Sequence, residues 1–71
     1  MTSYALDGRR SLVFHFVKEY LADNGYPPTV REIAQGVGLS STGTTQMHLN
    51  TLRKMGLLEG EGRTLRPVKA A

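Results

Sequence analysis

Residues 29–56 contain two helical patterns separated by a glycine-containing turn, and this spacing restricts the fold more than any other feature of the chain. Thr29 and Glu32 match a capping box, in which a threonine side chain and a glutamate three residues later satisfy free backbone amides at a helix start. Gly36 and Gly38 mark the turn that follows this short helix. A short helix, a tight turn and a second helix at this spacing are typical of a helix-turn-helix.

An amphipathic helix of about four turns is expected upstream of this motif. Apolar residues at three- and four-residue spacing would share one of its faces: Val13, Phe14, Phe16, Val17, Tyr20 and Leu21. Asp7 can cap its start, and Asn24-Gly25 can end it because glycine adopts the left-handed conformation freely. Residues 1–6 are expected to fray.

The rest of the core is expected to come from the helix-turn-helix and from a hairpin that follows it in the sequence. The expected inward-facing residues are Ile33, Ala34, Val37, Leu39, Leu49, Leu52 and Met55, with either Met47 or His48. Leu57-Leu58 predicts the start of a strand, residues 59–62 a turn, and residues 64–68 a return strand placed at an edge by Pro67. The predicted fold is mainly α, a single three-helix winged helix-turn-helix domain over residues 1–71. A C-terminal two-stranded β-hairpin forms the wing, and residues 69–71 are a tail or the start of a linker.

Small polar side chains fill the start of the second helix of the motif. Either Ser40 or Ser41 can cap it, and residues 42–46 are threonines, a glycine and a glutamine. Threonine and glycine are poor helix formers, so packing alone would favour other residues there. Short side chains let a helix end lie deep in the major groove of DNA, where glutamine can pair with adenine and a threonine methyl can touch thymine. The alternative is that these residues form only a long capping loop.

The composition excludes several classes of protein. The 71 residues can bury only a small core, and there are no cysteines for disulfides or thiolate metal sites. His15 and His48 are too far apart for a metal site, and no nucleophile is paired with a base. We therefore expect no enzyme and no metal, cofactor or small-molecule substrate. The longest apolar stretch is too short to cross a membrane, and the N-terminus has no signal-peptide pattern, so a cytoplasmic protein is expected.

The net charge of +3 is confined to the second half of the chain. Residues 1–30 carry three basic and three acidic side chains, whereas residues 31–71 carry six basic and three acidic ones. Polyanion binding predicts such a bias toward the helix-turn-helix and the hairpin. Small soluble domains also often carry a few extra lysines, so charge alone does not decide between the two interpretations.

Two arginines flank the tip of the predicted hairpin. A wing could bring Arg63 or Arg66 to a phosphate or the minor groove. Either could equally be a solvated charge that discourages edge-strand aggregation. Tyr26 is expected to cover the edge of the core rather than to bind phosphate, and His48 to be partly buried and hydrogen-bonded.

The segment from Gly25 to Glu59 closely resembles the N-terminal DNA-binding domain of the LexA repressor family, which controls the bacterial SOS response. The matching motifs are Pro27-Pro28-Thr29, Arg31–Ala34, Val37–Leu39, Ser40-Ser41, His48-Leu49, Leu52 and Lys54–Gly56. With the first helix included, the resemblance covers about residues 7–68. It implies a winged fold whose third helix enters the major groove.

The resemblance also implies particular DNA contacts. Base-reading residues would be Ser41, Gly43, Thr44, Gln46 and Met47. Contacts to the DNA backbone would come from Thr29, Arg31, Arg53, Lys54 and Arg63, and Ser40, Thr45 and Arg66 complete the predicted set. Gly43 departs from the family, which usually has a polar side chain there.

A second departure concerns the end of the chain. LexA continues into a self-cleaving domain with a Ser–Lys dyad that also supplies dimerisation, and this chain ends at Ala71. The sequence is thus expected to be either an excised domain or a small stand-alone bacterial or phage regulator without the self-cleaving domain.

We predict a sequence-specific regulator of transcription that binds a double-stranded DNA operator and represses it. One such domain on a short half-site should bind weakly, so two copies on a two-fold operator are expected, as a homodimer formed on DNA. The alternative is a winged-helix module that docks onto another protein through its third helix. Such a face would carry aromatic or large apolar residues.

Overall fold

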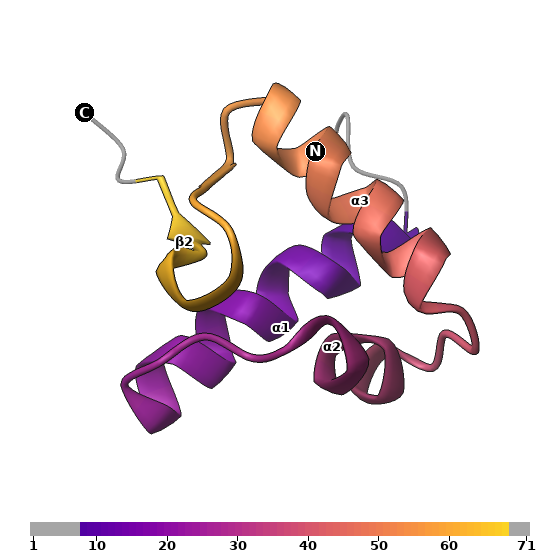
Figure 1. The fold of residues 1–71 in the computed structure, drawn as a ribbon, viewed down its shortest axis with the longest axis horizontal. Coiled ribbons are helices and arrows are strands. Elements are labelled where there is room, and N and C mark those ends of the chain that lie inside the picture. The colour runs from indigo at the N-terminus through magenta and orange to yellow at the C-terminus, as the bar shows by residue number, and fades with distance from the viewer. Residues whose placement is uncertain (1–7, 69–71) are drawn as a thin grey trace.

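The computed structural model describes residues 8–68, which form helices followed by a short hairpin (Figure 1). The elements in chain order are α1 (Gly8–Asn24), α2 (Val30–Val37), α3 (Thr42–Lys54), β1 (Leu58–Glu59), the 3₁₀ helix η1 (Gly62–Thr64) and β2 (Arg66–Pro67). The two strands are antiparallel, with Leu58 opposite Pro67 and Glu59 opposite Arg66. The predicted winged helix-turn-helix architecture is confirmed. The predicted Asp7 cap, the fraying of residues 1–6 and the tail at residues 69–71 lie outside the described residues.

The core lies where the helices and the hairpin meet. Each of the three helices contacts the other two, while β2 packs against α1 and β1 against α3 (Figure 1). Within residues 8–68 the buried apolar core consists of Val13, Val17, Ile33, Ala34, Val37, Leu49, Leu52, Leu58 and Leu65. Phe14, Phe16 and Leu39 are partly buried against this cluster. The apolar spacing therefore predicted most of the core correctly, although Met47 is 58% exposed and cannot be one of its members.

The first helix of the motif begins and ends as predicted. The Thr29 hydroxyl accepts a hydrogen bond from the Glu32 backbone N–H at 3.1 Å, and the Glu32 carboxylate accepts one from the Thr29 N–H at 2.8 Å. At the other end Gly38 has φ +77°, and the next residue, Leu39, donates its N–H to the Ala34 carbonyl at 2.8 Å. The left-handed glycine satisfies carbonyls that the helix end would leave free and sends the chain toward α3.

Gly36 lies inside α2 rather than in the turn, which corrects the prediction. A β-carbon at this position would lie 2.1 Å from Cε2 of Phe16. Glycine therefore fits here because the Phe16 ring of α1 occupies the space of a side chain, and Gly38 provides the positive φ of the turn.

The hairpin is shorter than predicted. Residues 64–68 were expected to form a strand, but η1 occupies residues 62–64 and β2 covers only residues 66–67. The Thr64 hydroxyl accepts from the Glu61 N–H at 3.0 Å, which favours a turn over an extended chain. Gly60, at φ +81°, has no room for a side chain because its β-carbon would lie 2.2 Å from the Thr64 carbonyl oxygen.

Candidate nucleic-acid interface

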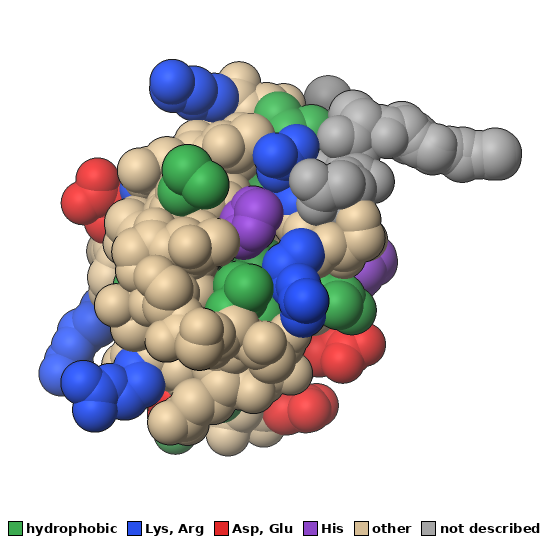
Figure 2. Space-filling view, turned by 90° about the vertical axis from the view of Figure 1, so that its right-hand side faces the viewer, with side chains coloured by type: hydrophobic (Ala, Val, Ile, Leu, Met, Phe, Trp, Pro, Cys, Tyr) green, Lys and Arg blue, Asp and Glu red, His purple; other side chains and the backbone are tan. Residues whose placement is uncertain are grey.

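The start of α3 combines a firmly capped helix end with exposed small side chains. Ser41 is the cap, because its hydroxyl accepts from the Thr44 N–H at 3.2 Å, and Ser40 is exposed in the bend before it. The exposed residues that follow on this helix are Thr42, Gly43, Met47, Asn50 and Lys54, with Thr44 and Gln46 half-buried. In the view of Figure 2 a broad surface of uncharged polar side chains and backbone has Lys and Arg side chains at its margin. Such a surface offers many hydrogen-bonding groups, with Met47 as its large apolar side chain.

The rotation of α3 about its axis follows from the residues that it buries. Thr45, Leu49 and Leu52 are at most 2% exposed and face the core. Their spacing of four and three residues places Gly43, Gln46 and other polar residues away from the core. The helix thus packs Thr45, Leu49 and Leu52 inward and presents most of its other small polar residues, together with Met47, outward.

Thr45 corrects the predicted contacts to the DNA backbone. Its side chain is fully buried, and its hydroxyl donates to the Ser41 carbonyl at 3.0 Å. Its backbone N–H also donates to the Ser41 carbonyl, at 3.2 Å. Because its polar groups are used inside the fold and no surface is exposed, Thr45 is a core residue and not a candidate contact.

Within residues 8–68, no neighbour requires glycine at position 43. A β-carbon there would meet only the Ser41 hydroxyl, at 3.5 Å, which is ordinary van der Waals contact. Glycine in a helix is less favourable than alanine by about 1 kcal/mol. The structure therefore gives no packing reason for Gly43, in contrast to Gly36.

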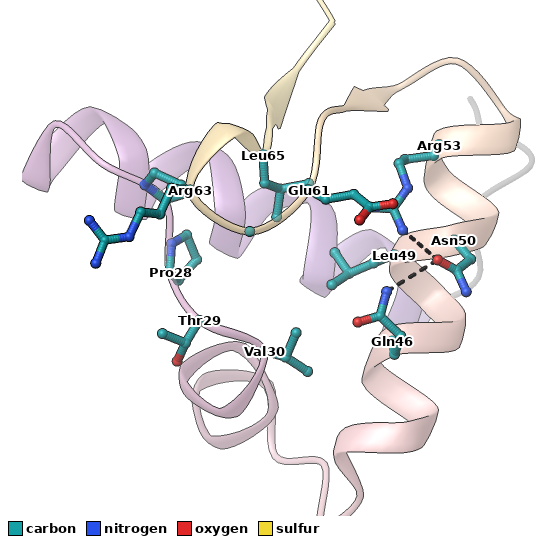
Figure 3. Close-up of a pocket in the computed structure, with 12 residues that line it drawn as sticks. Pro28, Thr29, Val30, Gln46, Leu49, Asn50, Arg53, Glu61, Arg63 and Leu65 are labelled. Atoms are coloured by element: carbon teal, nitrogen blue, oxygen red, sulfur yellow. Dashed lines mark hydrogen bonds between the residues drawn. The ribbon is translucent and has the colours of Figure 1, made fainter.

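A groove of about 500 Å³ separates α3 from the hairpin and the start of α2 (Figure 3). Pro28, Leu49 and Leu65 supply buried apolar side chains to its lining. Its polar lining residues include Thr29, Gln46, Asn50, Arg53, Glu61 and Arg63. The groove therefore brings together four predicted contacts from three separate elements: Thr29, Gln46, Arg53 and Arg63.

Comparison with known proteins identifies this arrangement. The family model of the LexA DNA-binding domain matches residues 3–66. The chain belongs to this family. It is 48% identical over 59 residues to a LexA repressor of Carboxydothermus hydrogenoformans, an alignment that covers 83% of this chain and 29% of the relative. LexA repressors of Clostridium novyi (44% over 57 residues) and Desulfatibacillum aliphaticivorans (46% over 54 residues) align over 80% and 76% of this chain. The chain spans about 30% of the length of these relatives.

In this LexA-family domain the two hairpin arginines have different surroundings. Arg63 lines the α3–hairpin groove (Figure 3). Arg66 forms an ion pair with Glu59, the residue opposite it in the hairpin, at 2.8 Å between Nε and Oε2. Arg66 also lines a separate hollow beside Leu21 of α1. The structure therefore favours Arg63 over Arg66 as a member of the candidate interface.

Arg53 has an intramolecular role that the sequence did not predict. Its guanidinium donates to the Gly60 carbonyl of the hairpin at 3.0 Å and to the Asn50 side-chain oxygen. Asn50 also accepts from the Gln46 side-chain amide at 3.1 Å (Figure 3). Asn50 was not among the predicted site residues, although its position four residues after Gln46 places it on the same face of the helix.

The remaining predicted contacts lie around the groove and along α3. Thr29 and Arg31 are exposed at the start of α2, and Lys54 is exposed in the last turn of α3. His48 is half-buried, which confirms the predicted partial burial. Tyr26 is 57% exposed and contacts the ring of Tyr20 edge-on at 5.9 Å, so it covers another ring at the surface.

The start of α2 carries a local electrostatic arrangement. The backbone N–H of Thr29 lowers the pKa of the Glu32 carboxyl below its usual value. The Tyr20 hydroxyl also donates to this carboxylate, at 3.3 Å, and desolvation together with the Glu32 charge raises the pKa of Tyr20. The carboxylate thus ties α1 to the capping box beside the groove.

Other classes of site find no support in the part of the chain that the structure describes. Residues 8–68 contain no group of three or more His, Cys, Asp or Glu side chains arranged to hold a metal ion. No helix within these residues has the length and apolar character needed to span a membrane. The family match concerns the DNA-binding part of a regulator and not a catalytic region.

Proposed function

We propose that this LexA-family domain binds double-stranded DNA in a sequence-specific way and acts as a transcriptional repressor. The observation that carries the proposal is the orientation of α3, which buries Thr45 and Leu49 and exposes the small polar residues of its first turns. A helix with short side chains at its start can lie in the major groove, which is about 12 Å wide. Gly43 would let the helix backbone approach the bases closely.

Four further base-reading residues belong to this proposal. Ser41 and Thr44 offer hydroxyls, Gln46 offers an amide, and the exposed Met47 side chain can contact a thymine methyl group. Arg31, Lys54 and Arg63, with Thr29 and Ser40, would contact phosphates and so fix the position of the domain on the duplex.

The oligomeric state on DNA is part of the same proposal. A single α3 reads only a few base pairs, and the free energy of these contacts must first offset the loss of translational and rotational freedom on association. Two domains on a two-fold operator double the contacts, and helix-turn-helix proteins place their half-sites about one helical turn, or a multiple of it, apart. We therefore expect a two-fold symmetric binding site.

Selection from a random duplex library tests the proposed function. The wild-type domain should enrich one motif, and the selected duplex should bind more tightly than a scrambled duplex of the same length at two salt concentrations. Phosphate contacts should weaken binding to both duplexes as salt rises, while the ratio between them persists. Binding with a steep salt dependence but no enriched motif would contradict sequence-specific recognition.

A protein-docking function is the second candidate, and the 58% exposure of Met47 is the observation that favours it. Docking faces centre on aromatic or large apolar residues, whereas the neighbours of Met47 on α3 are polar. Replacing Thr44 and Gln46 together by alanine distinguishes the two. Loss of DNA binding in a folded variant supports DNA recognition, whereas unchanged DNA binding with loss of a protein partner supports docking.

A further inference from the structure

We infer that Arg53 is a positioning residue that fixes the side-chain amides of Asn50 and Gln46, so that Gln46 is preset to recognise adenine. This inference rests on the proposed function and assigns two residues to it. Asn50 becomes a base-reading residue beside Gln46. Arg53 acts through these two amides rather than only as a positive charge.

The direction of the hydrogen bonds follows from the chemistry of arginine. A guanidinium can only donate, so the Asn50 atom that faces Arg53 must be the carbonyl oxygen Oδ1. The Gln46 atom that faces the same oxygen, at 3.1 Å, must then be the amide nitrogen Nε2. One donor-only side chain thus determines which way two amides point (Figure 3).

Each of the two side-chain amides keeps hydrogen-bonding groups that the Arg53–Asn50 and Gln46–Asn50 hydrogen bonds do not use. Gln46 retains its Oε1 acceptor and one N–H donor, which are complementary to the N6 donor and N7 acceptor of adenine in the major groove. Asn50 is exposed and retains both N–H groups of its Nδ2, which can donate to a purine N7 or to guanine O6. A reversed Gln46 amide would lose the bond to Asn50. The fixed orientation therefore favours adenine before DNA is bound.

The hairpin holds Arg53 in place. Arg53 Nη1 donates to the Gly60 carbonyl at 3.0 Å while Nη2 donates to Asn50. Position 60 requires glycine, because φ is +81° and an added β-carbon would lie 2.2 Å from the Thr64 carbonyl oxygen. The wing therefore supports the reading surface of α3 from within the protein, through one guanidinium.

The test begins with the motif that the wild-type domain enriches from a random duplex library. Each adenine of that motif is replaced in turn by 7-deazaadenine, which lacks the N7 acceptor. At one position the substitution should weaken wild-type binding by roughly tenfold, and the Gln46→Ala variant should bind both duplexes almost equally. If no motif is enriched, the proposed function fails and this inference fails with it.

Variants of Arg53 and Asn50 then separate positioning from charge. The adenine preference is the affinity for the adenine duplex divided by that for the 7-deazaadenine duplex, roughly tenfold in the wild type. Arg53→Lys keeps the charge but loses the planar fork, and it should reduce this preference to about twofold or less. In a Gln46→Ala background the same substitution should have no further effect on the preference. Asn50→Ala should also abolish the preference, whereas Asn50→Asp, which can still accept both hydrogen bonds, should retain it.

Two results would overturn the inference while the proposed function stands. One is an Arg53→Lys variant that keeps the full wild-type preference for adenine over 7-deazaadenine, whether or not its affinity for both duplexes falls by the same factor. The other is an Asn50→Ala variant that still prefers adenine. Thermal unfolding of each variant verifies that it is folded, and the two Asn50 variants decide the question if Arg53→Lys does not fold.

Discussion

The ring of Phe16 occupies the space that a side chain at Gly36 would need, with Cε2 only 2.1 Å from the position of a β-carbon there. Phe16 lies on α1 and Gly36 on the last turn of α2. The ring therefore leaves no room for a side chain at position 36 of α2.

Substitution of Gly36 by alanine should destabilise the domain. Alanine favours the helix by about 1 kcal/mol, but displacing the Phe16 ring should cost about 1–3 kcal/mol, so the net loss of stability should be up to about 2 kcal/mol. Gly43→Ala is the matched control, because the same change there meets only ordinary contact and should leave stability unchanged or raise it by about 0.5 kcal/mol. Urea unfolding of the wild type, Gly36→Ala and Gly43→Ala measures the free energy of unfolding of each protein. Equal effects of the two substitutions would show that the Phe16 contact does not constrain position 36.

The Glu32 carboxylate should make the stability of the domain depend on pH. Its pKa is lowered in the folded protein by the Thr29 backbone N–H, so its contribution is complete above the usual glutamate pKa of about 4.3. As the pH falls through the lower pKa of the folded state, the native carboxylate takes up a proton and the contribution is lost. Glu32→Gln keeps an acceptor for the capping box but cannot titrate.

Urea unfolding of wild type and Glu32→Gln between about pH 6 and pH 3 isolates this effect. The free energy of unfolding of the wild type should fall more steeply with decreasing pH than that of the variant. Parallel curves would mean that Glu32 does not contribute to the pH dependence.

The sequence predicted the fold well where one local pattern decides the structure. The capping box of Thr29 and Glu32 lies entirely within four residues, so its side chains needed no distant partner. The apolar spacing of α1 likewise predicted the burial of Val13 and Val17. Such features depend on chain geometry that is the same in any helix.

The errors occur where distant residues decide. Gly36 was assigned to the turn because Phe16, whose ring leaves no room for a side chain at position 36, lies twenty residues earlier in the sequence. Thr45 was assigned to the surface from its polarity, although its position four residues before Leu49 placed it on the buried face. The hydrogen bond from Arg53 to Gly60 depends on the path of the hairpin tip, which no local pattern specifies.

The two hairpin arginines should differ in their effect on DNA binding. Arg63→Gln removes a charge from the edge of the α3–hairpin groove, so affinity should fall by a similar factor for all duplexes and the salt slope should decrease by about 1. Arg66→Gln is the matched control, because Arg66 is paired with Glu59 and lies in a separate hollow, and it should change affinity less than about twofold. A larger effect of Arg66→Gln than of Arg63→Gln would place DNA on the opposite side of the hairpin.

Glu61 should weaken DNA binding in the wild-type domain. It lines the same groove as Arg63 and would bring a negative charge toward the phosphates. Neutralising it in Glu61→Gln should raise affinity for all duplexes by about twofold to fivefold at low salt, with a smaller gain at high salt. Fluorescence anisotropy titrations at two salt concentrations measure the change. Unchanged affinity at low salt would indicate that this side of the groove remains far from the duplex.

An NMR titration of the domain with its selected duplex tests most directly whether α3 faces the bases. The largest chemical-shift changes should occur at Ser41, Gly43, Thr44, Gln46 and Met47, with nuclear Overhauser contacts from the Thr44 and Met47 methyl groups to base protons. A scrambled duplex should shift mainly the phosphate-contacting residues. Changes confined to α1, or an identical pattern with both duplexes, would contradict base recognition by α3.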